Sequence, residues 1–328
     1  MAQNMPDSSG ITHSWEAYWH GIADAGAFSS GGANHPAILS FWNEFFQFVR
    51  GDGTVSSLVD LASGNGAVVQ SAREVFGDDE VQMTAIDISA AAIANIRQRF
   101  PGVKGLVMDL KSIDLADERF DLVTSQFGIE YAGSQAVVDA ARLVRENGWM
   151  ALLMHSAESS IHRQCAENLT AIERVVECRF IPHSIEMFRA GFAAVRGADR
   201  TPYDQAAKRL APAVGELESI MTEYGQDVAD DTVVRLYRDL ARIHENIQYH
   251  EPDEVLGWLE RMREELETYA GRMSSMCESV IDEDELERIC NQLRSQQFTI
   301  TTVGPLLSGD GEVNLGWALI ARKGRTTA

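Results

Sequence analysis

Several features that would direct the interpretation elsewhere are scarce in this chain. It has four cysteines in 328 residues, Cys165, Cys178, Cys277 and Cys290, and no two of them form a C-x-x-C pair. No signal peptide is recognisable ahead of them, so we expect a reduced, cytoplasmic setting. No apolar run approaches the roughly 18 residues that a membrane span needs, so no transmembrane segment is expected.

Basic residues are also scarce, because 28 Lys and Arg stand against 49 Asp and Glu, for a formal net charge of −21. Binding nucleic acid or an anionic membrane needs a face dense in Lys and Arg, and the longest basic cluster spans only residues 322–325. We therefore expect a small-molecule partner, with no nucleic acid or membrane, and an acidic surface that serves solubility. No group of His and Cys residues shows close metal-ligand spacing, so no metal is expected.

What is present is a full complement of core residues in an alternating order. Apolar residues make up 45% of the chain, which is enough for a packed core. Alternation of strands and helices between residues 55 and 155 predicts a parallel sheet covered by helices. The expected strands are 55–61, 81–87, 104–108, 120–126 and 148–155, and the expected helices are 66–76, 89–99, 111–116 and 133–146.

The periodicity divides the chain into three parts. Residues 1–50 carry many aromatic residues and are expected to form an N-terminal helical lid or cap. Residues 51–156 and 297–328 are expected to form the α/β core, which two terminal strands, 298–303 and 313–320, complete as a hairpin. Residues 157–296 are long, charged and helical in period. They predict a helical insertion that roofs the substrate pocket or forms a homodimer contact.

Three acids end successive apolar runs, namely Asp60, Asp87 and Asp109. The first run passes into a glycine turn and then a helical pattern, in the sequence LVDLASGNGAV of residues 58–68. Because parallel strands end at one edge of a sheet, these acids are expected to line that edge, where ligands bind. A buried strand that delivers a glycine turn to a helix N-terminus is typical of a nucleoside-cofactor site.

Two cofactors fit this arrangement. A dinucleotide site uses G-x-G-x-x-G, and Val69 stands here where the third glycine is expected, which disfavours an NAD(P)-dependent oxidoreductase without removing it as an alternative. S-adenosylmethionine carries a cationic amine that Asp60 can hold and ribose hydroxyls that Asp87 can bind. Asp109 can accept from the adenine amine. The residues expected to approach the nucleoside through backbone groups or flanking side chains are Ala62, Gly64, Gly66, Ile88 and Leu110.

At this point the chain resembles a class I S-adenosylmethionine-dependent methyltransferase of the Rossmann-like superfamily, small-molecule type, over residues 55–155 with 298–323. The segments that carry the resemblance are 58–66, 85–89, 107–110, 120–127 and 143–153. The resemblance implies an α/β sheet of seven mostly parallel strands with an antiparallel C-terminal hairpin, S-adenosylmethionine as cofactor, and contacts from Asn65, Gln126 and Phe127. The glycine loop departs from the family pattern at Ala62.

Methyl transfer from a sulfonium is an in-line displacement, so alignment of the groups is the main requirement. Glu130 and Tyr131 follow the fourth strand, where the family places its acceptor, and His155 ends the fifth strand with a side chain suited to act as a base. Capping or core roles are the alternatives for these three. On this basis O-methylation is favoured over N-methylation, and the N/D-P-P-Y/F motif of several amine methyltransferases is missing.

Trp15, Tyr18 and Trp19 lie at helical spacing before a glycine-rich segment. They fit a core stripe, or a lid over the cofactor whose ring faces attract the sulfonium. We expect them to contact the cofactor. A further alternative for the whole chain is a non-catalytic cofactor-binding module on the same fold.

Overall fold

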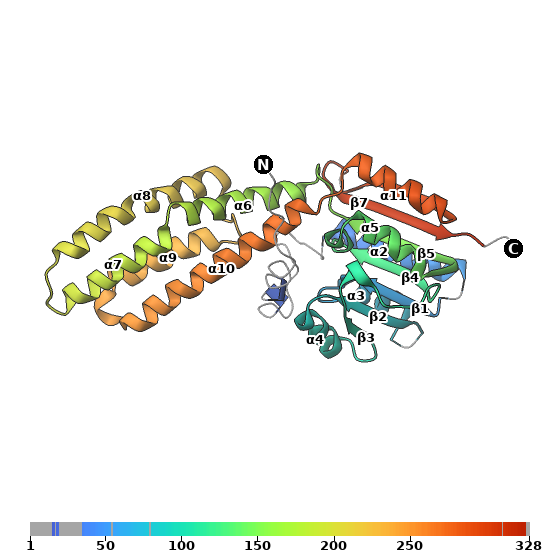
Figure 1. Ribbon diagram of the computed structural model, residues 1–328, viewed down its shortest axis with the longest axis horizontal. Coiled ribbons are helices and arrows are strands. Elements are labelled where there is room, and N and C mark those ends of the chain that lie inside the picture. The colour runs from blue at the N-terminus through green and yellow to red at the C-terminus, as the bar shows by residue number, and fades with distance from the viewer. Residues whose placement is uncertain are drawn as a thin grey trace. The chain divides into compact units, whose positions relative to one another are not determined.

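The structure is a computed structural model that describes residues 15–16, 18–19, 35–53, 55–78, 80–309 and 311–325. The chain divides into two compact units, one formed by residues 1–163 with 275–328 and the other by residues 164–274. The first unit contains the sheet and the second is helical (Figure 1).

The first unit is built on one sheet with the order β3-β2-β1-β4-β5-β7-β6. Neighbours from β3 to β5 are parallel, whereas β7 runs antiparallel to both β5 and β6. This confirms the seven-stranded, mostly parallel sheet with an antiparallel C-terminal hairpin. The strands are β1 (Ser57–Leu61), β2 (Gln82–Asp87), β3 (Lys104–Val107), β4 (Phe120–Gln126), β5 (Val144–Met154), β6 (Phe298–Leu307) and β7 (Asn314–Lys323).

After residue 35, the described α-helices that lie wholly within this unit form its core with the sheet through their apolar faces. They are α2 (Pro36–Asp52), α3 (Ala67–Phe76), α4 (Ala90–Arg99), α5 (Ser134–Ala140) and α11 (Glu283–Ser295). Proline stands at the start of α2, where its missing N–H costs nothing, and Trp42 and Phe46 of that helix are fully buried. The central strands are buried along nearly their whole length, as expected for strands covered on both faces.

Two expected elements differ from the observed ones. The helix expected over 133–146 ends early, because α5 gives way to a short 3-10 helix, η4 (Ala141–Leu143), and then to β5. Within β5, Asn147 is left-handed, and a Cβ on Gly148 would lie 2.8 Å from the carbonyl oxygen of Asp121, so the strand bends closely past β4 there. The helix expected over 111–116 is only the 3-10 turn η2 (Leu110–Ser112).

The second unit is a set of long amphipathic helices. It is made of α7 (Phe180–Val195), α8 (Thr201–Tyr224), α9 (Thr232–Glu245), the short η5 (Ile247–Tyr249), and most of α6 (Ser160–Glu177) and α10 (Pro252–Glu278). Its core includes Phe180, Phe188 and Leu217, all buried. Helix α11, which the sequence placed with the insertion, instead belongs to the first unit and packs on α5 and β6.

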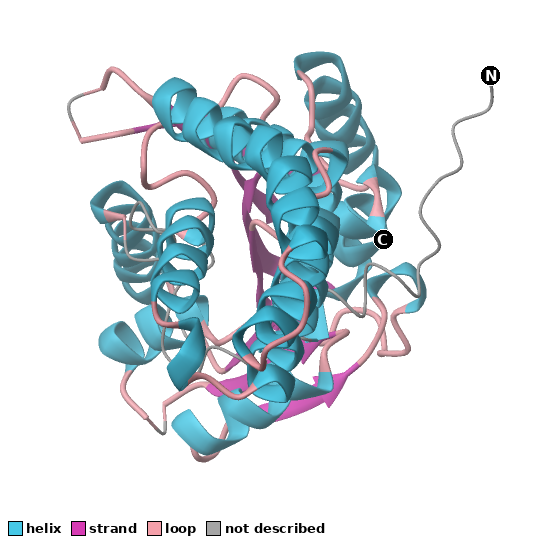
Figure 2. Cartoon of the chain, turned by 90° about the vertical axis from the view of Figure 1, so that its left-hand side faces the viewer, coloured by secondary structure: helices cyan, strands magenta, loops and turns pink. Residues whose placement is uncertain are grey.

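Helices make up most of the described chain, and the strands gather in a single sheet (Figure 2). Of the helices in the described residues, none combines the length and the apolar character needed to cross a membrane.

Candidate functional site

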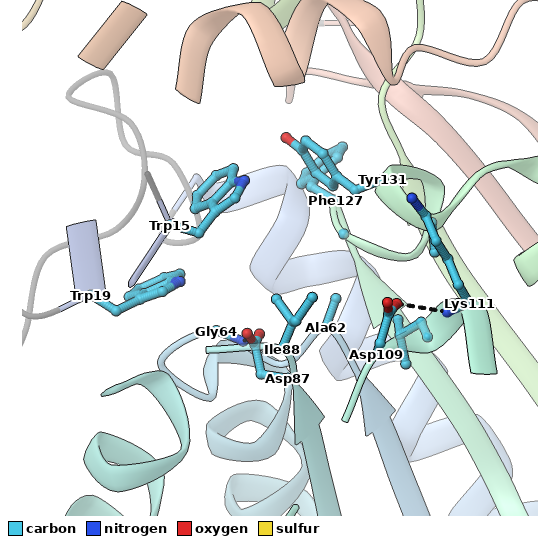
Figure 3. Close-up of a pocket in the computed structure, with 13 residues that line it drawn as sticks. Trp15, Trp19, Ala62, Gly64, Asp87, Ile88, Asp109, Lys111, Phe127 and Tyr131 are labelled. Atoms are coloured by element: carbon cyan, nitrogen blue, oxygen red, sulfur yellow. Dashed lines mark hydrogen bonds between the residues drawn. The ribbon is translucent and has the colours of Figure 1, made fainter. Parts of the chain in front are cut away.

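The strand ends of the parallel sheet open into a cavity with two adjoining parts. Both parts are lined by Trp15, Trp19, Ala62, Gly64, Phe127 and Tyr131. The first, here called the Asp87 part, is also lined by Asp87, Ile88, Asp109, Leu110 and Lys111. The second, the His155 part, is also lined by Asp60, Asn65, Ala67, Val68, Gln126, His155 and Met276. In Figure 3 the two tryptophans and the Phe127–Tyr131 pair stand on opposite sides of the space above Ala62, Asp87 and Ile88.

The glycine loop needs glycine at two positions, because the backbone there is left-handed and a side chain would clash with neighbouring rings. Gly64 is left-handed with a φ of +51°, and a Cβ there would lie 2.8 Å from the ring of Trp19. Gly66 is also left-handed, and a Cβ would lie 2.7 Å from the ring of Phe100. Ala62, the departure from the family pattern, is left-handed as well, and its methyl group occupies the space that a Cβ on Gly128 would need. The loop therefore keeps its turn with alanine because the opposing residue is glycine.

Asp60 is a buried acid that lines the His155 part of the cavity, with 1% of its surface exposed. Its Oδ1 accepts a hydrogen bond from Thr124 Oγ1 at 3.0 Å, but Oδ2 has no hydrogen-bond partner among the described residues. Burial raises the pKa of Asp60 to about 8, and the nearby Asp87 charge adds to this against the opposing Thr124 bond. A buried acid in this condition favours a cation beside it.

Asp87 and Asp109 stand at the ends of β2 and β3 and line the Asp87 part. The carboxylate of Asp87 accepts from Gly64 N at 2.8 Å and from Ser89 N at 2.9 Å, which fixes its orientation. Burial raises the pKa of Asp87, and these backbone hydrogen bonds oppose the rise. Asp109 accepts from Lys111 N at 2.9 Å and so begins η2 (Figure 3). A carboxylate offers about four acceptor positions, so both acids can still accept from a ligand.

A short N-terminal turn reaches the cavity from far away in the sequence. Residues 15, 16, 18 and 19 are helical, and the carboxylate of Glu16 accepts from Ser89 Oγ at 2.5 Å and Ala91 N at 3.1 Å at the start of α4. Asn95 Nδ2 donates to the carbonyl of Trp19 at 3.1 Å. These bonds hold Trp19 against Gly64 and bring Trp15 to 5.5 Å from the Tyr131 ring, measured between centroids.

His155 and Glu130 form a buried pair. One carboxylate oxygen of Glu130, Oε1, accepts from the His155 amide at 2.8 Å and lies 2.6 Å from its Nδ1. The His155 ring lies 4.8 Å from that of Phe127 and 5.7 Å from that of Tyr131, between centroids. Because a carboxylate can only accept, the pair directs the hydrogen to Nδ1 and the lone pair to Nε2.

Most of the predicted site residues lie together at this cavity. Three do not line it in the described structure. Gly66 instead begins α3, Tyr18 packs on Ala91 and Ala92 of α4, and Glu130 lies behind His155. Glu130 was expected to face the acceptor. In the structure its carboxylate instead points to the backbone amide and the ring of His155.

The sequence interpretation missed several residues of the site. Lys111 and Met276 line the cavity, Glu16 ties down the N-terminal turn, and Trp42 donates from its Nε1 to Gln126 Oε1 at 2.6 Å. Only Glu16 had a usable signal, since it lies between the tryptophans already singled out. Met276 lies near the C-terminal end of α10, and no local sequence pattern indicates that this part of the helix lines the cavity. Among the described residues, no group of three or more His, Cys, Asp or Glu is placed to hold a metal ion.

Comparisons with known proteins find similarity to methyltransferases. Residues 59–152 match the family model described as a methyltransferase domain. A curated relative, malonyl-[acyl-carrier protein] O-methyltransferase of Enterobacter lignolyticus, is 29% identical over 104 residues, which are 31% of this chain and 40% of the relative. The match thus spans less than half the length of that relative.

Solved structures with weak similarity include three methyltransferases. The S-adenosylmethionine-dependent methyltransferase of Mesorhizobium loti is 20% identical, covers 37% of this chain and 57% of its own, and has a TM-score of 0.31. The N-methyltransferase NodS of Bradyrhizobium japonicum, in complex with S-adenosyl-L-homocysteine, is 15% identical over 45% and 76%, with a TM-score of 0.36. The carbon methyltransferase CurJ is 9% identical over 88% and 55%, with a TM-score of 0.43. At these scores the likenesses decide nothing about the acceptor.

Proposed function

We propose that residues 59–152, which match the methyltransferase domain model, form a class I, Rossmann-like methyltransferase domain, and that the chain transfers a methyl group from S-adenosylmethionine to a small-molecule acceptor. Oxygen is the acceptor atom we favour, and nitrogen is the alternative. The observation that carries the proposal is the Oδ2 atom of Asp60, which is buried at the glycine loop and has no hydrogen-bond partner among the described residues.

This atom distinguishes between the two cofactors that fit the sequence. A dinucleotide would bring its pyrophosphate to the start of α3, where its negative charge would oppose ionisation of Asp60 and would gain no ion pair from it. S-adenosylmethionine brings a positively charged α-amine, which can donate a hydrogen bond to Oδ2 and form an ion pair with the ionised carboxylate. The pKa of Asp60 is raised because a buried carboxylate without a neighbouring cation is less stable than the neutral acid.

The remaining groups of S-adenosylmethionine also have partners. Asp87 suits the ribose hydroxyls, and Asp109 with Ile88 and Leu110 suits the adenine. The first intrahelical bond of α3 runs from Gln70 N to Gly66 O, so the amides of Ala67 and Val68 precede it. Ala67 and Val68 line the His155 part, and their amides can donate to the α-carboxylate, with the positive end of the helix dipole behind them.

The cofactor supplies a methyl group already activated on a sulfonium. The residues of this chain have to align the acceptor and take its proton. His155 lines the same part of the cavity as Asp60, and Glu130 fixes the ring so that Nε2 is the basic nitrogen. Glu130 is thus a positioning residue, and Tyr131 and Phe127 form the walls beside the ring.

A buried base bears on the choice of acceptor atom. A neutral amine already has a lone pair for attack, and its proton can leave afterwards. A hydroxyl gains much more from losing its proton as the new bond forms. The His155–Glu130 pair therefore favours oxygen over nitrogen.

The proposal also includes Trp15 and Trp19 as a cover over the cofactor, whose ring faces would attract the sulfonium. A reduced cytoplasmic setting, the absence of nucleic acid as a partner, and a roofing or dimerising role for the helical unit rest on the sequence and stay predictions.

The test of the proposal is binding followed by transfer. We expect the purified chain to bind S-adenosylhomocysteine at micromolar concentration and NAD not measurably, and to release S-adenosylhomocysteine from S-adenosylmethionine when supplied with hydroxyl acceptors. Preferential NAD binding would favour the oxidoreductase alternative. Tight cofactor binding with no transfer to any of a broad acceptor panel would favour the non-catalytic module.

A further inference from the structure

Gln126 lies at the end of β4 and lines the His155 part of the cavity. The Gln126 side-chain amide is oriented by Trp42, a fully buried residue of α2. The indole N–H of Trp42 donates to Gln126 Oε1 at 2.6 Å. An indole nitrogen can only donate, so the amide oxygen must face Trp42. The Nε2 group, with its two hydrogens, is therefore on the other side of the amide.

The same part of the cavity contains the base. In the pairing of β4 with β5, Gln126 lies opposite Leu153, and His155 follows two residues later along the chain. His155 directly follows the last residue of β5, Met154, and the side chains of Gln126 and His155 both line the His155 part of the cavity. One donor and one base are thus presented together beside Phe127 and Tyr131.

The resemblance implied that Gln126 contacts the cofactor, but the cofactor groups assigned above do not need this donor. The α-amine is assigned to Asp60 and the α-carboxylate to the first-turn amides of α3, which leaves the Gln126 amide facing the acceptor. An acceptor that gives up a proton to His155 develops negative charge on its oxygen. An N–H donor fixed in advance at that oxygen stabilises the charge without reorganising as it forms.

We propose that Gln126, oriented by Trp42, binds the ionising oxygen of the acceptor, and that the acceptor is a weakly acidic hydroxyl compound, a phenol or an enol. This inference rests on the proposed function. In the step, the hydroxyl proton passes to His155 Nε2 and the oxygen lone pair forms the bond to the methyl carbon. The carbon–sulfur bond breaks with its electron pair left on sulfur. The products are the methyl ether, S-adenosylhomocysteine and a protonated imidazole.

The experiment measures probe binding to the complex of the full chain with S-adenosylhomocysteine. The probes are 4-nitrophenol and the enol of acetylacetone, whose absorbance changes on ionisation, with benzylamine as the amine comparison. We expect at least one hydroxyl probe to bind with its ionised fraction raised above that in free solution at the same pH. Benzylamine is expected not to compete with it.

Three variants and one control variant separate the roles. Gln126→Met removes the donor without adding charge, and it should weaken binding of the ionised probe by about ten- to a hundredfold while changing S-adenosylhomocysteine affinity less than twofold. Trp42→Phe keeps an aromatic ring at this position and removes the N–H, so it should give a smaller loss of the same kind. Gln126→Glu places a negative charge beside the ionised probe and should abolish its binding. Gln82→Glu makes the same change at the exposed first residue of β2, away from the strand ends that line the cavity, and is the control.

The outcomes point to different failures. If wild-type protein does not bind S-adenosylhomocysteine, the proposed function fails. If it does, the role of Gln126 is overturned by unchanged probe binding in Gln126→Met, or by an equal loss of S-adenosylhomocysteine affinity in that variant. Binding of benzylamine alone would overturn the acceptor class, and so would binding of none of the three probes. Circular dichroism of each variant shows whether a loss reflects unfolding.

Discussion

Replacing Asp60 with asparagine should make the protein more stable and its cofactor binding weaker. In the folded chain the pKa of Asp60 is about 8, against 3.8 for an unperturbed aspartate. At pH 7 the unfolded chain has this group ionised and the folded chain has it neutral, so folding must take up a proton. At about 1.4 kcal/mol for each pKa unit, this costs the wild-type protein about 4 kcal/mol at pH 7.

The direction with pH follows from the same difference. A carboxyl whose pKa is raised on folding leaves stability unaffected below its unfolded pKa and lowers it as pH rises, until the folded pKa is passed. Asparagine cannot ionise, and it can still accept from Thr124 Oγ1 in place of Oδ1. The stability gain from Asp60→Asn should therefore grow by about 1.4 kcal/mol per pH unit between pH 5 and 7 and level off above pH 8.

The assay is urea unfolding of both proteins at pH 5, 6, 7 and 8, with S-adenosylhomocysteine affinity measured in parallel. Asp121→Asn is the matched control. That buried carboxylate accepts from the backbone amides and hydroxyls of Ser56 and Ser57 and pairs with Arg145, so its loss should destabilise the fold. An Asp60→Asn protein that is less stable than wild type, or whose stability difference does not change with pH, would refute the reasoning.

Other consequences of the site can be tested separately. Asp87→Ala removes the acceptor for the ribose and leaves Gly64 N and Ser89 N without their carboxylate, so calorimetry should show S-adenosylhomocysteine affinity lower by at least tenfold; an unchanged affinity would argue against the site. The affinity of the wild type for S-adenosylhomocysteine should be highest near pH 8, because the pair of Asp60 and the ligand α-amine binds best when it carries one proton in total. An affinity that stays constant toward low pH would contradict this. Trp19→Ala should speed S-adenosylhomocysteine dissociation in stopped-flow measurements without lowering the melting temperature of the free protein by more than a few degrees.

The sheet and the gathering of three acids at one of its edges were predictable because each depends on a local pattern. Apolar runs that end in Asp60, Asp87 and Asp109 specify both a buried parallel strand and the acid that follows it, and parallel pairing then brings the acids to one edge. The glycine turn was equally local.

The second layer of the site was not predictable in this way. Glu130 and His155 were singled out separately, but their pairing depends on a 3-10 turn, η3 (Ile129–Ala132), that turns the carboxylate back toward the end of β5. The contact of Trp42 with Gln126 joins residues 84 positions apart. From the sequence, Trp42 is indistinguishable from an ordinary core residue of an amphipathic helix, because the hydrophobic periodicity does not depend on its hydrogen bond.

The boundary of the helical insertion was also set by packing rather than pattern. Helix α11 has the same charged, amphipathic sequence character as the helices before it. It nevertheless covers β6 and α5, because the terminal hairpin presents an apolar face that needs a helix. Sequence period identifies a helix but does not say which core receives it.

The central claim is that the buried acid at the glycine loop selects S-adenosylmethionine. The most direct measurement is calorimetric titration of the purified protein with S-adenosylhomocysteine, run beside NAD and NADP, for wild type and Asp60→Asn. We predict micromolar binding of S-adenosylhomocysteine alone by the wild type, weakened by at least tenfold in the variant. Binding of a dinucleotide in preference, or S-adenosylhomocysteine affinity that is the same in both proteins, would contradict it.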